Sequence, residues 1–390
     1  MAGPRTAPLA GGSPLPAGGQ PPIADEPSGA GPLSQLLRDP SVTDVLVNGR
    51  DVWVDRGTGL VRAAVRFGST DEVRRLAQRL AAVAGRRLDE GAPFTDARLP
   101  DGSRLHAVLP PIATTGPYLS LRTLRRRSFT LAELVAAGTV DAAGAGLLGA
   151  IVAARLAFVV SGGTGSGKTT LLASLLALVP PDERIVLVED SAELRPDHPH
   201  VVGLQSRTSN VEGIGDVPLR ALVRQALRMR PDRLVVGECR GAEVVDLLGA
   251  LNTGHEGGAG TLHANAAQDV PARLEALGLL DGVPREALHA QIAAGLHAVV
   301  HVRRGPAGRV VEQVCLLVPG GTRRMVVAVP AWRRETGPGP AADDLAALLA
   351  HRGVPRPPAL GGVRRPLGHD GRAFTAGPTR IGPLTQEVRR

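Results

Sequence analysis

The sequence is poor in cysteine, in aromatic residues and in long apolar runs, and each shortage excludes a class of protein. Its 390 residues include two cysteines, Cys239 and Cys315, which are far apart in the chain. Two distant cysteines cannot build a disulfide framework or a four-cysteine zinc site, so we expect no zinc. This cysteine usage fits a reducing cytoplasm.

Aromatic side chains make up 2% of the chain, so hydrophobic cores must be built from leucine, valine, isoleucine and alanine. The formal net charge of +8 attracts polyanions and acidic membrane surfaces. A nucleic-acid site would interleave aromatic residues with basic ones to stack on bases, and no such pattern occurs. The charge therefore favours solvated arginine-rich faces over nucleic-acid binding.

Apolar runs are short. The longest uncharged run of small apolar residues covers 142–154, which is too short and too rich in glycine to span a bilayer. The N-terminus has no basic segment followed by an apolar core, so we expect no signal peptide. We expect a cytoplasmic protein that associates with the cytoplasmic membrane peripherally.

Residues 162–169 fit the pattern G-x-x-x-x-G-K-[ST] at every fixed position. The apolar run before them, 156–160, predicts a buried strand, and residues 170–178 predict a helix. A strand, a glycine-rich loop and a helix N-terminus form a phosphate cradle, in which Lys168 binds the β- and γ-phosphates and Thr169 binds Mg²⁺. The predicted nucleotide-binding residues of this stretch are Gly162, Gly163, Thr164, Gly165, Ser166, Gly167, Lys168, Thr169 and Thr170.

The regions before the phosphate cradle differ in composition. Residues 1–32 are rich in proline, glycine and alanine, which predicts disorder. Residues 33–128 predict a small α/β domain with an antiparallel sheet. Its signals are the Asn48-Gly49 hairpin turn, an amphipathic helix over 71–84, and strand-like pieces at 97–109 and 118–122, before the basic residues 125–127 begin a linker.

In residues 129–330, strands and helices alternate after the phosphate cradle, which predicts a parallel sheet covered by helices. An antiparallel hairpin over 298–317, turning at 305–308, is expected at one edge of this sheet. Residues 331–390 are again rich in proline, glycine and arginine, so we expect mostly disorder with one short helix at 341–350.

Further clusters of polar residues follow the phosphate cradle. A strand over 184–189 runs into three carboxylates, Glu189, Asp190 and Glu193, where α/β sheets bind ligands. Residues 230–241 resemble a Walker B strand, with Gly237 in place of the usual aspartate and Glu238 next. Before them, Arg220, Arg224 and Arg228 form a stripe on one helix face, and after them a glycine-rich loop carries His255 and His263. The carboxylates, the arginine stripe and the histidines, each taken alone, also fit an ordinary solvated surface, and the missing aspartate weakens the Walker B match.

Together these segments resemble the type II and type IV secretion ATPases, and above all the tight-adherence (Flp-type) pilus assembly ATPases of actinobacterial type. The resemblance covers roughly residues 33–320. It rests on the phosphate cradle, the acidic box at 189–194, the atypical Walker B segment at 227–241, the histidine box at 253–257 and 261–265, and residues 96–104 of the first domain.

The resemblance implies an N-terminal PAS-like α/β domain, a flexible linker and a RecA-like P-loop ATPase domain that assemble as a homo-hexamer. ATP and Mg²⁺ would bind between the two domains. Hydrolysis would power pilus assembly or protein secretion across the cytoplasmic membrane, together with inner-membrane platform proteins. The family also implies roles for individual residues.

By resemblance, Glu193 positions the attacking water and Glu238 supports Mg²⁺ through a water, although Glu189 stays open as the catalytic carboxylate. His255 and His263 would couple the γ-phosphate to movement. Four arginines would reach phosphates of the bound nucleotide or of a neighbouring subunit, namely Arg104, Arg122, Arg220 and Arg228.

The sequence departs from the family at Gly258-Ala259-Gly260, where relatives often have Ser-Leu-Thr, and at Glu256, where aspartate is common. It also lacks the four-cysteine insert of the type II secretion branch. Two other functions stay open. A RecA-like DNA translocase of a conjugation system fits the basic charge but not the acidic and histidine boxes, and a non-hydrolysing scaffold does not fit the intact Lys168, Glu193 and Glu238.

Overall fold

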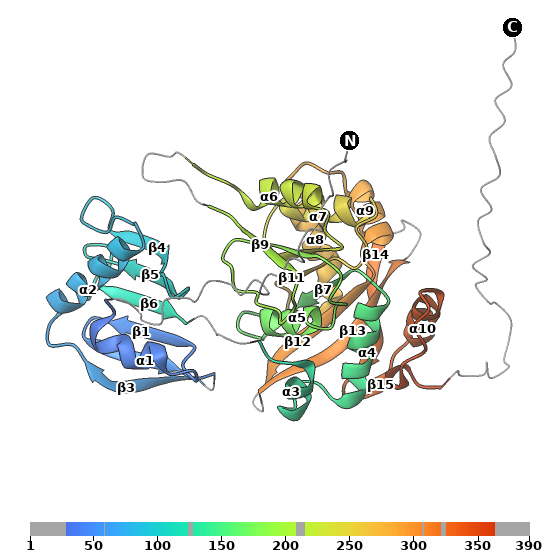
Figure 1. Cartoon of the computed structure of the whole chain (residues 1–390), viewed down its shortest axis with the longest axis horizontal. Coiled ribbons are helices and arrows are strands. Elements are labelled where there is room, and N and C mark those ends of the chain that lie inside the picture. Colours follow the sequence, from blue (N-terminus) through green and yellow to red (C-terminus); the bar gives the residue numbers. More distant parts are fainter. Residues whose placement is uncertain are drawn as a thin grey trace, which may run out of the picture.

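The computed structural model describes residues 29–57, 59–123, 128–207, 215–305, 308–320 and 325–362. In this part of the chain the strands form two sheets, one of six strands and one of nine (Figure 1). We call the six-stranded sheet with its helices the N-terminal domain, and the nine-stranded sheet with its helices the C-terminal domain. The predictions made for 1–28, for the basic residues 125–127 and for 363–390 lie outside the described residues.

The sheet of the N-terminal domain has the order β3-β2-β1-β6-β5-β4, with antiparallel neighbours throughout. The predicted hairpin is confirmed: Asn48 pairs with Asp51 around Gly49, whose φ of 60° suits a tight turn. The strands are β1 (Asp44–Asn48), β2 (Asp51–Asp55), β3 (Leu60–Arg66), β4 (Phe94–Arg98), β5 (Arg104–Val108) and β6 (Tyr118–Arg122).

The main helix of this domain is α2 (Thr70–Val83), which the sequence predicted over 71–84. Ser69 caps it by accepting the N–H of Glu72, and its apolar face buries Val73, Leu76 and Leu80 in the core of the domain. A short turn, η1 (Gly31–Leu33), and a one-turn helix, α1 (Ser34–Arg38), precede the first strand.

The sheet of the C-terminal domain has the order β15-β14-β13-β12-β7-β11-β10-β8-β9. The six strands from β12 to β9 in this order are mutually parallel, as the alternation of strands and helices predicted. Their bounds are β7 (Phe158–Ser161), β8 (Ile185–Glu189), β9 (Val201–Gln205), β10 (Arg233–Cys239), β11 (Ala259–Leu262) and β12 (Ala298–Gly305).

The predicted hairpin is present but does not form an edge. Strand β12 pairs with β7 in parallel, and the sheet continues through β13 (Gly308–Gly320), β14 (Met325–Arg333) and β15 (Gly337–Pro338). The long strand β13 supplies hydrogen-bonding groups on both sides, so a further antiparallel strand can pair with it.

The predicted end of the C-terminal domain at residue 330 is wrong, because it falls inside β14. Trp332 is buried against α4, so closely that a Cβ on Gly144 would lie 2.7 Å from its ring. The helix predicted at 341–350 is present as α10 (Ala342–His351), which buries Leu345 and Leu349 in the same core. The prediction failed because the segment is rich in proline and glycine overall, although a few of its apolar residues pack into the core.

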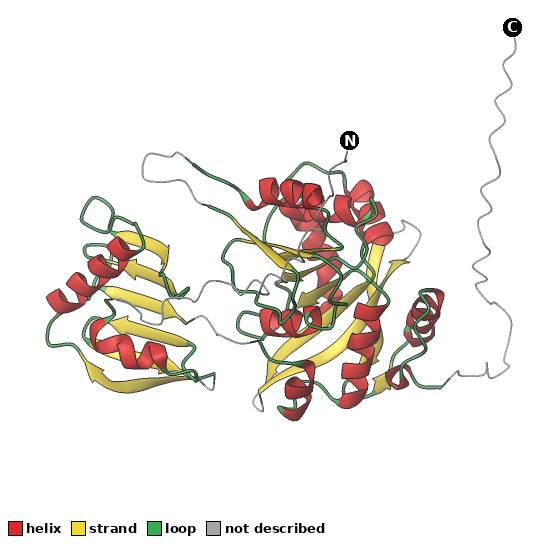
Figure 2. Ribbon diagram, viewed as in Figure 1, coloured by secondary structure: helices red, strands yellow, loops and turns green. Residues whose placement is uncertain are grey.

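Helices cover both faces of the nine-stranded sheet (Figure 2). One apolar core includes residues of α3 (Leu131–Ala136), α4 (Ala142–Ala153), α5 (Lys168–Leu176) and α10. The other includes residues of α6 (Leu219–Ala226), α7 (Glu243–Leu251), α8 (Val270–Leu279) and α9 (Arg285–Gly295). Short turns complete the fold at η2 (Leu227–Met229), η3 (Ala267–Asp269) and η4 (Pro358–Leu360). Among the described residues, none of the helices has the length and apolar character needed to cross a bilayer.

Candidate nucleotide site

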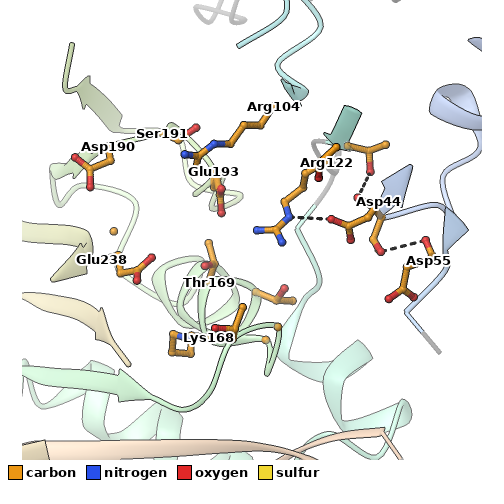
Figure 3. A pocket seen from close by; sticks show the side chains of 18 of the residues that line it. Asp44, Asp55, Arg104, Arg122, Lys168, Thr169, Asp190, Ser191, Glu193 and Glu238 are labelled. Atoms are coloured by element: carbon orange, nitrogen blue, oxygen red, sulfur yellow. Dashed lines mark hydrogen bonds and ion pairs between the residues drawn. The ribbon is translucent and has the colours of Figure 1, made fainter. Parts of the chain in front are cut away.

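A cleft of about 630 Å³ lies between the two domains, at the carboxyl ends of the parallel strands. The glycine-rich loop follows β7, the acidic segment follows β8, Glu238 lies near the end of β10, and His263 follows β11. Parallel strands place their carboxyl ends at one sheet edge, so four segments that are separate in sequence meet there. In Figure 3, Lys168 and Thr169 lie at the floor of the cleft, with Arg104 and Arg122 of the N-terminal domain above them.

The glycine-rich loop has the backbone that a phosphate cradle needs. Gly165 and Gly167 have φ values of 69° and 99°, which favour glycine, and a Cβ on Gly162 would lie 2.2 Å from the carbonyl oxygen of Val302. Ser166 is buried, and its hydroxyl has no hydrogen-bond partner among the described residues. The loop therefore combines inward-facing backbone with an unsatisfied polar group, which fits a bound phosphate.

Lys168 begins α5 and is buried, with its ammonium group turned back on the loop. Its Nζ donates to the carbonyl oxygens of Gly162 at 3.1 Å and Gly163 at 2.9 Å. Burial lowers the pKa of Lys168, and nearby Glu238 partly offsets this effect. The two carbonyl oxygens are neutral acceptors for the Lys168 ammonium group. Charged phosphate oxygens would accept stronger hydrogen bonds from it.

His263 lies between Lys168 and Glu238. Its Nε2 is 2.8 Å from Glu238 Oε1, and its Nδ1 is 3.3 Å from Lys168 Nζ. Burial lowers the pKa of His263, and the Lys168 ammonium lowers it further. Burial raises the pKa of Glu238, but the Arg240 guanidinium, 2.6 Å away, outweighs burial and keeps the net pKa below its usual value. The site thus holds an ionised carboxylate beside a neutral imidazole at neutral pH.

Glu189 is a functional candidate whose role the sequence left open. It is buried, and its Oε1 accepts the backbone N–H groups of Glu193 and Leu194, both at 3.0 Å. Burial raises its pKa to about 7, although these two hydrogen bonds favour the charged form. Glu189 thereby fixes the start of the segment that carries Glu193.

Gly237 explains the atypical Walker B strand. A Cβ at this position would lie 2.6 Å from the Cγ of Glu189, so a larger residue would displace the buried carboxyl group. The sequence contains both parts of this arrangement, since glycine replaces the usual aspartate on β10 and a glutamate ends β8. Only the parallel pairing of β8 with β10 reveals that the two positions are neighbours.

Glu193 lines the cleft with Asp190 and Ser191, and its side chain is exposed. Figure 3 shows Asp190 and Glu238 to the left of Thr169, Glu193 above it, and Asp44 and Asp55 to the right. The carboxylates of the C-terminal domain therefore gather at one end of the cleft, within the space where a terminal phosphate bound by Lys168 would lie.

The predicted arginines of the N-terminal domain do line the cleft. Arg104 holds Asp96 with two hydrogen bonds, of 3.0 and 2.7 Å, and Arg122 holds Asp44 at 3.1 Å. Both pairs are partly exposed, so each contributes about 1 kcal/mol or less and a phosphate group can replace the aspartate.

The prediction that His255 acts on the nucleotide is wrong for the nucleotide of its own chain. His255 precedes β11, whereas the glycine-rich loop follows β7, and β11 runs parallel to β7 with Ala259 opposite Phe158. His255 therefore lies at the amino edge of the sheet and His263 at the carboxyl edge. Proximity in the sequence concealed that a whole strand separates them.

Arg220 and Arg228 also lie outside the cleft of their own chain. Arg220 binds Asp246 at 2.5 Å and makes a bidentate pair with Asp281, which joins α6 to α7 and to the end of α8. Arg228 is exposed and donates to the carbonyl oxygen of Arg224 at 3.2 Å. The prediction that they reach the phosphates of their own chain's nucleotide is therefore wrong.

Several residues of the cleft were not singled out in the sequence. Arg304 lies at the end of β12 and Arg309 at the start of β13, and Asp44, Asp55 and Leu60 come from the N-terminal domain. The two arginines flank the Gly-Pro-Ala-Gly turn, which was the available signal. Nothing in the sequence shows which strand ends of one domain face the other domain.

Comparison with known proteins gives the family. The model of the family described as "Type II/IV secretion system protein" matches residues 26–321. The chain belongs to this family. It is thus a member of the secretion and pilus-motor ATPases, as the sequence predicted, and several of the residues on which the resemblance rested, namely Lys168, Glu193, Glu238 and His263, meet in the cleft.

Two curated relatives illustrate the likeness. A Mycobacterium tuberculosis protein named "Putative conjugal transfer protein" is 58% identical over 334 residues, which cover 84% of this chain and 94% of the relative. The type IV secretion system protein PtlH of Bordetella pertussis is 32% identical over 342 residues, which cover 79% of this chain and 95% of the relative. Each match is long enough to include residues of both domains.

Among solved structures, the pilus retraction motor PilT with bound ADP matches with a TM-score of 0.52 and 22% identity, over 74% of this chain and 83% of PilT. At this identity the likeness supports the fold alone. The fold of this secretion ATPase is accordingly the mixed α/β arrangement of its family, in which a smaller α/β domain is followed in the sequence by a RecA-like domain.

Proposed function

We propose that this secretion ATPase binds ATP and Mg²⁺ in the cleft between its domains and hydrolyses the bond between the β- and γ-phosphates. The observation that carries the proposal is the meeting of Lys168, Glu193, Glu238 and His263 at one sheet edge, opposite Arg104 and Arg122. A lysine that binds phosphate, carboxylates that position water and metal, and arginines that balance the phosphate charge are the parts that phosphoryl transfer requires.

Binding begins with exchange of partners at the glycine-rich loop. Lys168 leaves the carbonyl oxygens of Gly162 and Gly163 and binds phosphate oxygens, while backbone N–H groups of the loop bind the β-phosphate. The Thr169 hydroxyl and, through a water, the Glu238 carboxylate would hold Mg²⁺. When bound, the ion would neutralise charge that develops on the phosphates.

Glu193 would then orient the attacking water. Its backbone is held by Glu189, so the side chain is presented at a fixed place over Lys168 and Thr169. His263 contacts both Lys168 and Glu238, which lets it report loss of the γ-phosphate to β11 and the segment after it. This assigns catalysis to Glu193, with Glu189 as its positioning residue.

Arg104 and Arg122 would exchange Asp96 and Asp44 for phosphate oxygens when ATP binds. Because both arginines belong to the N-terminal domain, this exchange couples nucleotide occupancy to the relative position of the two domains. We propose that the chain works as a homo-hexamer, and Arg228, which is exposed on the C-terminal domain, is a candidate for contact with a neighbouring subunit.

The work done would be pilus assembly of the tight-adherence type or protein secretion, at the cytoplasmic face of the membrane and against an inner-membrane platform protein. Family membership and the positive net charge, which suits an acidic membrane surface, support this proposal. A second candidate, DNA translocation in a conjugation system, is favoured by the names of relatives described as conjugal transfer proteins.

One experiment separates these candidates. ATP turnover of the full chain is measured across protein concentration, with particle size from light scattering, and then with duplex DNA or anionic vesicles added. Cooperative turnover by a hexamer-sized particle, stimulated by vesicles but not by DNA, would support the secretion motor. Stimulation by DNA alone would support the translocase, and full turnover by a monomer would contradict the hexamer.

A further inference from the structure

Arg98 of the N-terminal domain contacts the backbone of the acidic segment, residues 189–194. It ends β4, and its guanidinium group reaches the C-terminal domain. There its Nη2 donates to the carbonyl oxygen of Ala192 at 3.2 Å, and its Nη1 donates to Gln205 Oε1 at 2.7 Å. Ala192 directly precedes Glu193 in the sequence. Arg98 is therefore attached to the segment that presents the carboxylate to which we assign the positioning of water.

The backbone around Glu193 depends on single hydrogen bonds for its conformation. Residues 190–200 form neither helix nor strand, so no ladder of backbone hydrogen bonds fixes them. The peptide unit that joins Ala192 to Glu193 is instead held on both of its sides. Its N–H donates to Glu189 Oε1 at 3.0 Å, and its carbonyl oxygen accepts from Arg98. Because one partner belongs to each domain, the orientation of this peptide unit depends on both domains.

A tight turn holds Arg98 in place within its own domain. Residues 99–103 connect β4 to β5, and the Leu99 N–H donates to the Ser103 carbonyl oxygen at 2.8 Å. Asp101 Oδ1 accepts the Ser103 N–H at 2.9 Å, and Leu99 is buried in the core of the N-terminal domain. With its neighbours fixed in this way, the backbone of Arg98 moves only when the N-terminal domain moves.

Arg98 differs from Arg104, which lies opposite it across the β4–β5 hairpin. Arg104 lines the cleft and is paired with Asp96, so it can exchange that carboxylate for a phosphate group. Arg98 does not line the cleft, and both of the acceptors that the structure describes for it are neutral. A hydrogen bond from a guanidinium group is charge-assisted and therefore stronger than one between neutral groups. One arginine of the hairpin is thus available to the nucleotide, and the other holds the backbone beside it.

We propose that Arg98 is a positioning residue for hydrolysis, which orients the Glu193 carboxylate towards the attacking water by holding the carbonyl group of Ala192. The inference rests on the proposed function, in which Glu193 orients that water. When the two domains separate, the Ala192 carbonyl group loses its donor, while the N–H of Glu193 keeps its bond to Glu189. The peptide unit can then turn, so that ATP stays bound at the glycine-rich loop but is hydrolysed slowly.

The test measures turnover and ATP binding separately in the full chain. Arg98→Ala should lower kcat about ten- to a hundredfold, the effect of displacing a catalytic group by about 1 Å. The dissociation constant of ATP should not change, because Arg98 does not line the cleft. Arg98→Met keeps the apolar stem of the side chain but has no donor, so it should show the same loss and replaces Arg98→Ala if that variant is unstable. Circular dichroism verifies that each variant is folded.

The matched control is Gln205→Ala. Gln205 is exposed at the end of β9, and this change removes one hydrogen bond of Arg98 between the domains but leaves the bond to Ala192. A general loosening of the contact between the domains would lower turnover in both variants. If the Ala192 carbonyl group is the decisive contact, kcat of Gln205→Ala should stay close to that of the wild type.

A double-mutant cycle tests whether Arg98 acts through Glu193. In Glu193→Gln no carboxylate is left to orient, so adding Arg98→Ala should lower the single-turnover rate by less than about twofold, as for residues that act as a unit. The full loss in the double variant would overturn the proposal, because Arg98 would then act on the nucleotide independently of Glu193.

Two further results would also overturn the role of Arg98. One is an unchanged kcat in both Arg98→Ala and Arg98→Met, and the other is an equal loss in Arg98→Ala and Gln205→Ala. Normal turnover by Glu193→Gln, or no ATP hydrolysis by the wild type, would instead contradict the proposed function itself.

Discussion

The parallel strands of the nine-stranded sheet carry charged residues at both of their ends, the carboxyl edge and the amino edge. The two sets of charged residues differ in the partners that they contact. At the carboxyl edge, Lys168 and Glu238 contact partners that a ligand can replace. At the amino edge, Arg233 is 1% exposed and fully engaged, since it holds Glu183 at 2.6 Å and the carbonyl oxygen of Val152 at 3.2 Å. Arg155 adds a second contact to Glu183 at 2.7 Å.

The difference shows how to separate binding residues from stabilising ones in a sheet of this kind. A buried charge with permanent protein partners has no hydrogen-bonding capacity left for a ligand, and removing it destabilises the fold because its partner is then buried and unpaired. A charge at the opposite edge, held by carbonyl groups or by exposed carboxylates, can exchange partners at little cost. Changes at the amino edge should therefore affect stability, and changes at the carboxyl edge should affect turnover.

The largest expected effect is at the amino edge. Arg233→Ala leaves Glu183 without its buried partner, so the free energy of unfolding should fall by about 3–5 kcal/mol. Chemical denaturation measures this loss. Arg155→Ala removes a half-exposed partner of the same carboxylate and should cost about 1 kcal/mol or less. If Arg233→Ala unfolded no more easily than Arg155→Ala, the amino edge would not be the stabilising edge.

Glu189 belongs to the carboxyl edge but is buried, so its charge should affect stability as a function of pH. Its pKa is raised to about 7 in the folded chain, so the folded state favours the protonated carboxyl group. Stability from this group is complete below its unfolded pKa of about 4.3 and is lost as pH rises to 7. The loss is about 3–4 kcal/mol.

Glu189→Gln should remove this dependence, because an amide keeps the acceptor for Glu193 and Leu194 but carries no charge. Denaturation midpoints of both proteins at pH 5 and at pH 8 provide the measurement. From pH 5 to pH 8 the denaturation midpoint of the wild type should fall relative to that of Glu189→Gln. Parallel pH profiles would show that Glu189 titrates normally and would contradict its description as a buried carboxylate.

The smallest expected effect compares the two histidines. His263→Ala breaks the contacts to Lys168 and Glu238 and should lower kcat about tenfold, the effect of losing roughly 1.4 kcal/mol of transition-state stabilisation. His255→Ala, at the amino edge, should change kcat by less than about twofold. Steady-state assays of both variants at matched concentration provide the test. Equal losses would return His255 to the nucleotide, through a neighbouring subunit.

Much of the fold was predictable because its signals are local. The glycine-rich loop, the Asn48-Gly49 turn and the amphipathic helix α2 each depend on residues that are close in the sequence. Strands β3 and β9 were missed because they lie at sheet edges, where β3 exposes most of its side chains and has no alternating apolar pattern. Apart from the helix predicted at 341–350, the folded region beyond residue 330 was missed because a few buried apolar residues such as Trp332 fix an otherwise polar segment to the core.

The candidate site was predictable only in part, for a topological reason. Residues that end parallel strands could be grouped from the sequence, since a sheet brings its carboxyl ends together. His255 was misplaced because one strand within the histidine box carries the chain from one edge to the other. Arg304 and Leu60 could not be foreseen, because their proximity depends on how two domains approach.

The measurement that tests the central claim most directly is turnover and ATP binding by Glu193→Gln beside Lys168→Ala. Removing the carboxylate that orients water should lower kcat by about a hundredfold or more and leave the dissociation constant of ATP unchanged. Lys168→Ala should weaken ATP binding itself. Normal turnover by Glu193→Gln would contradict the assignment of the carboxyl edge as the hydrolytic site.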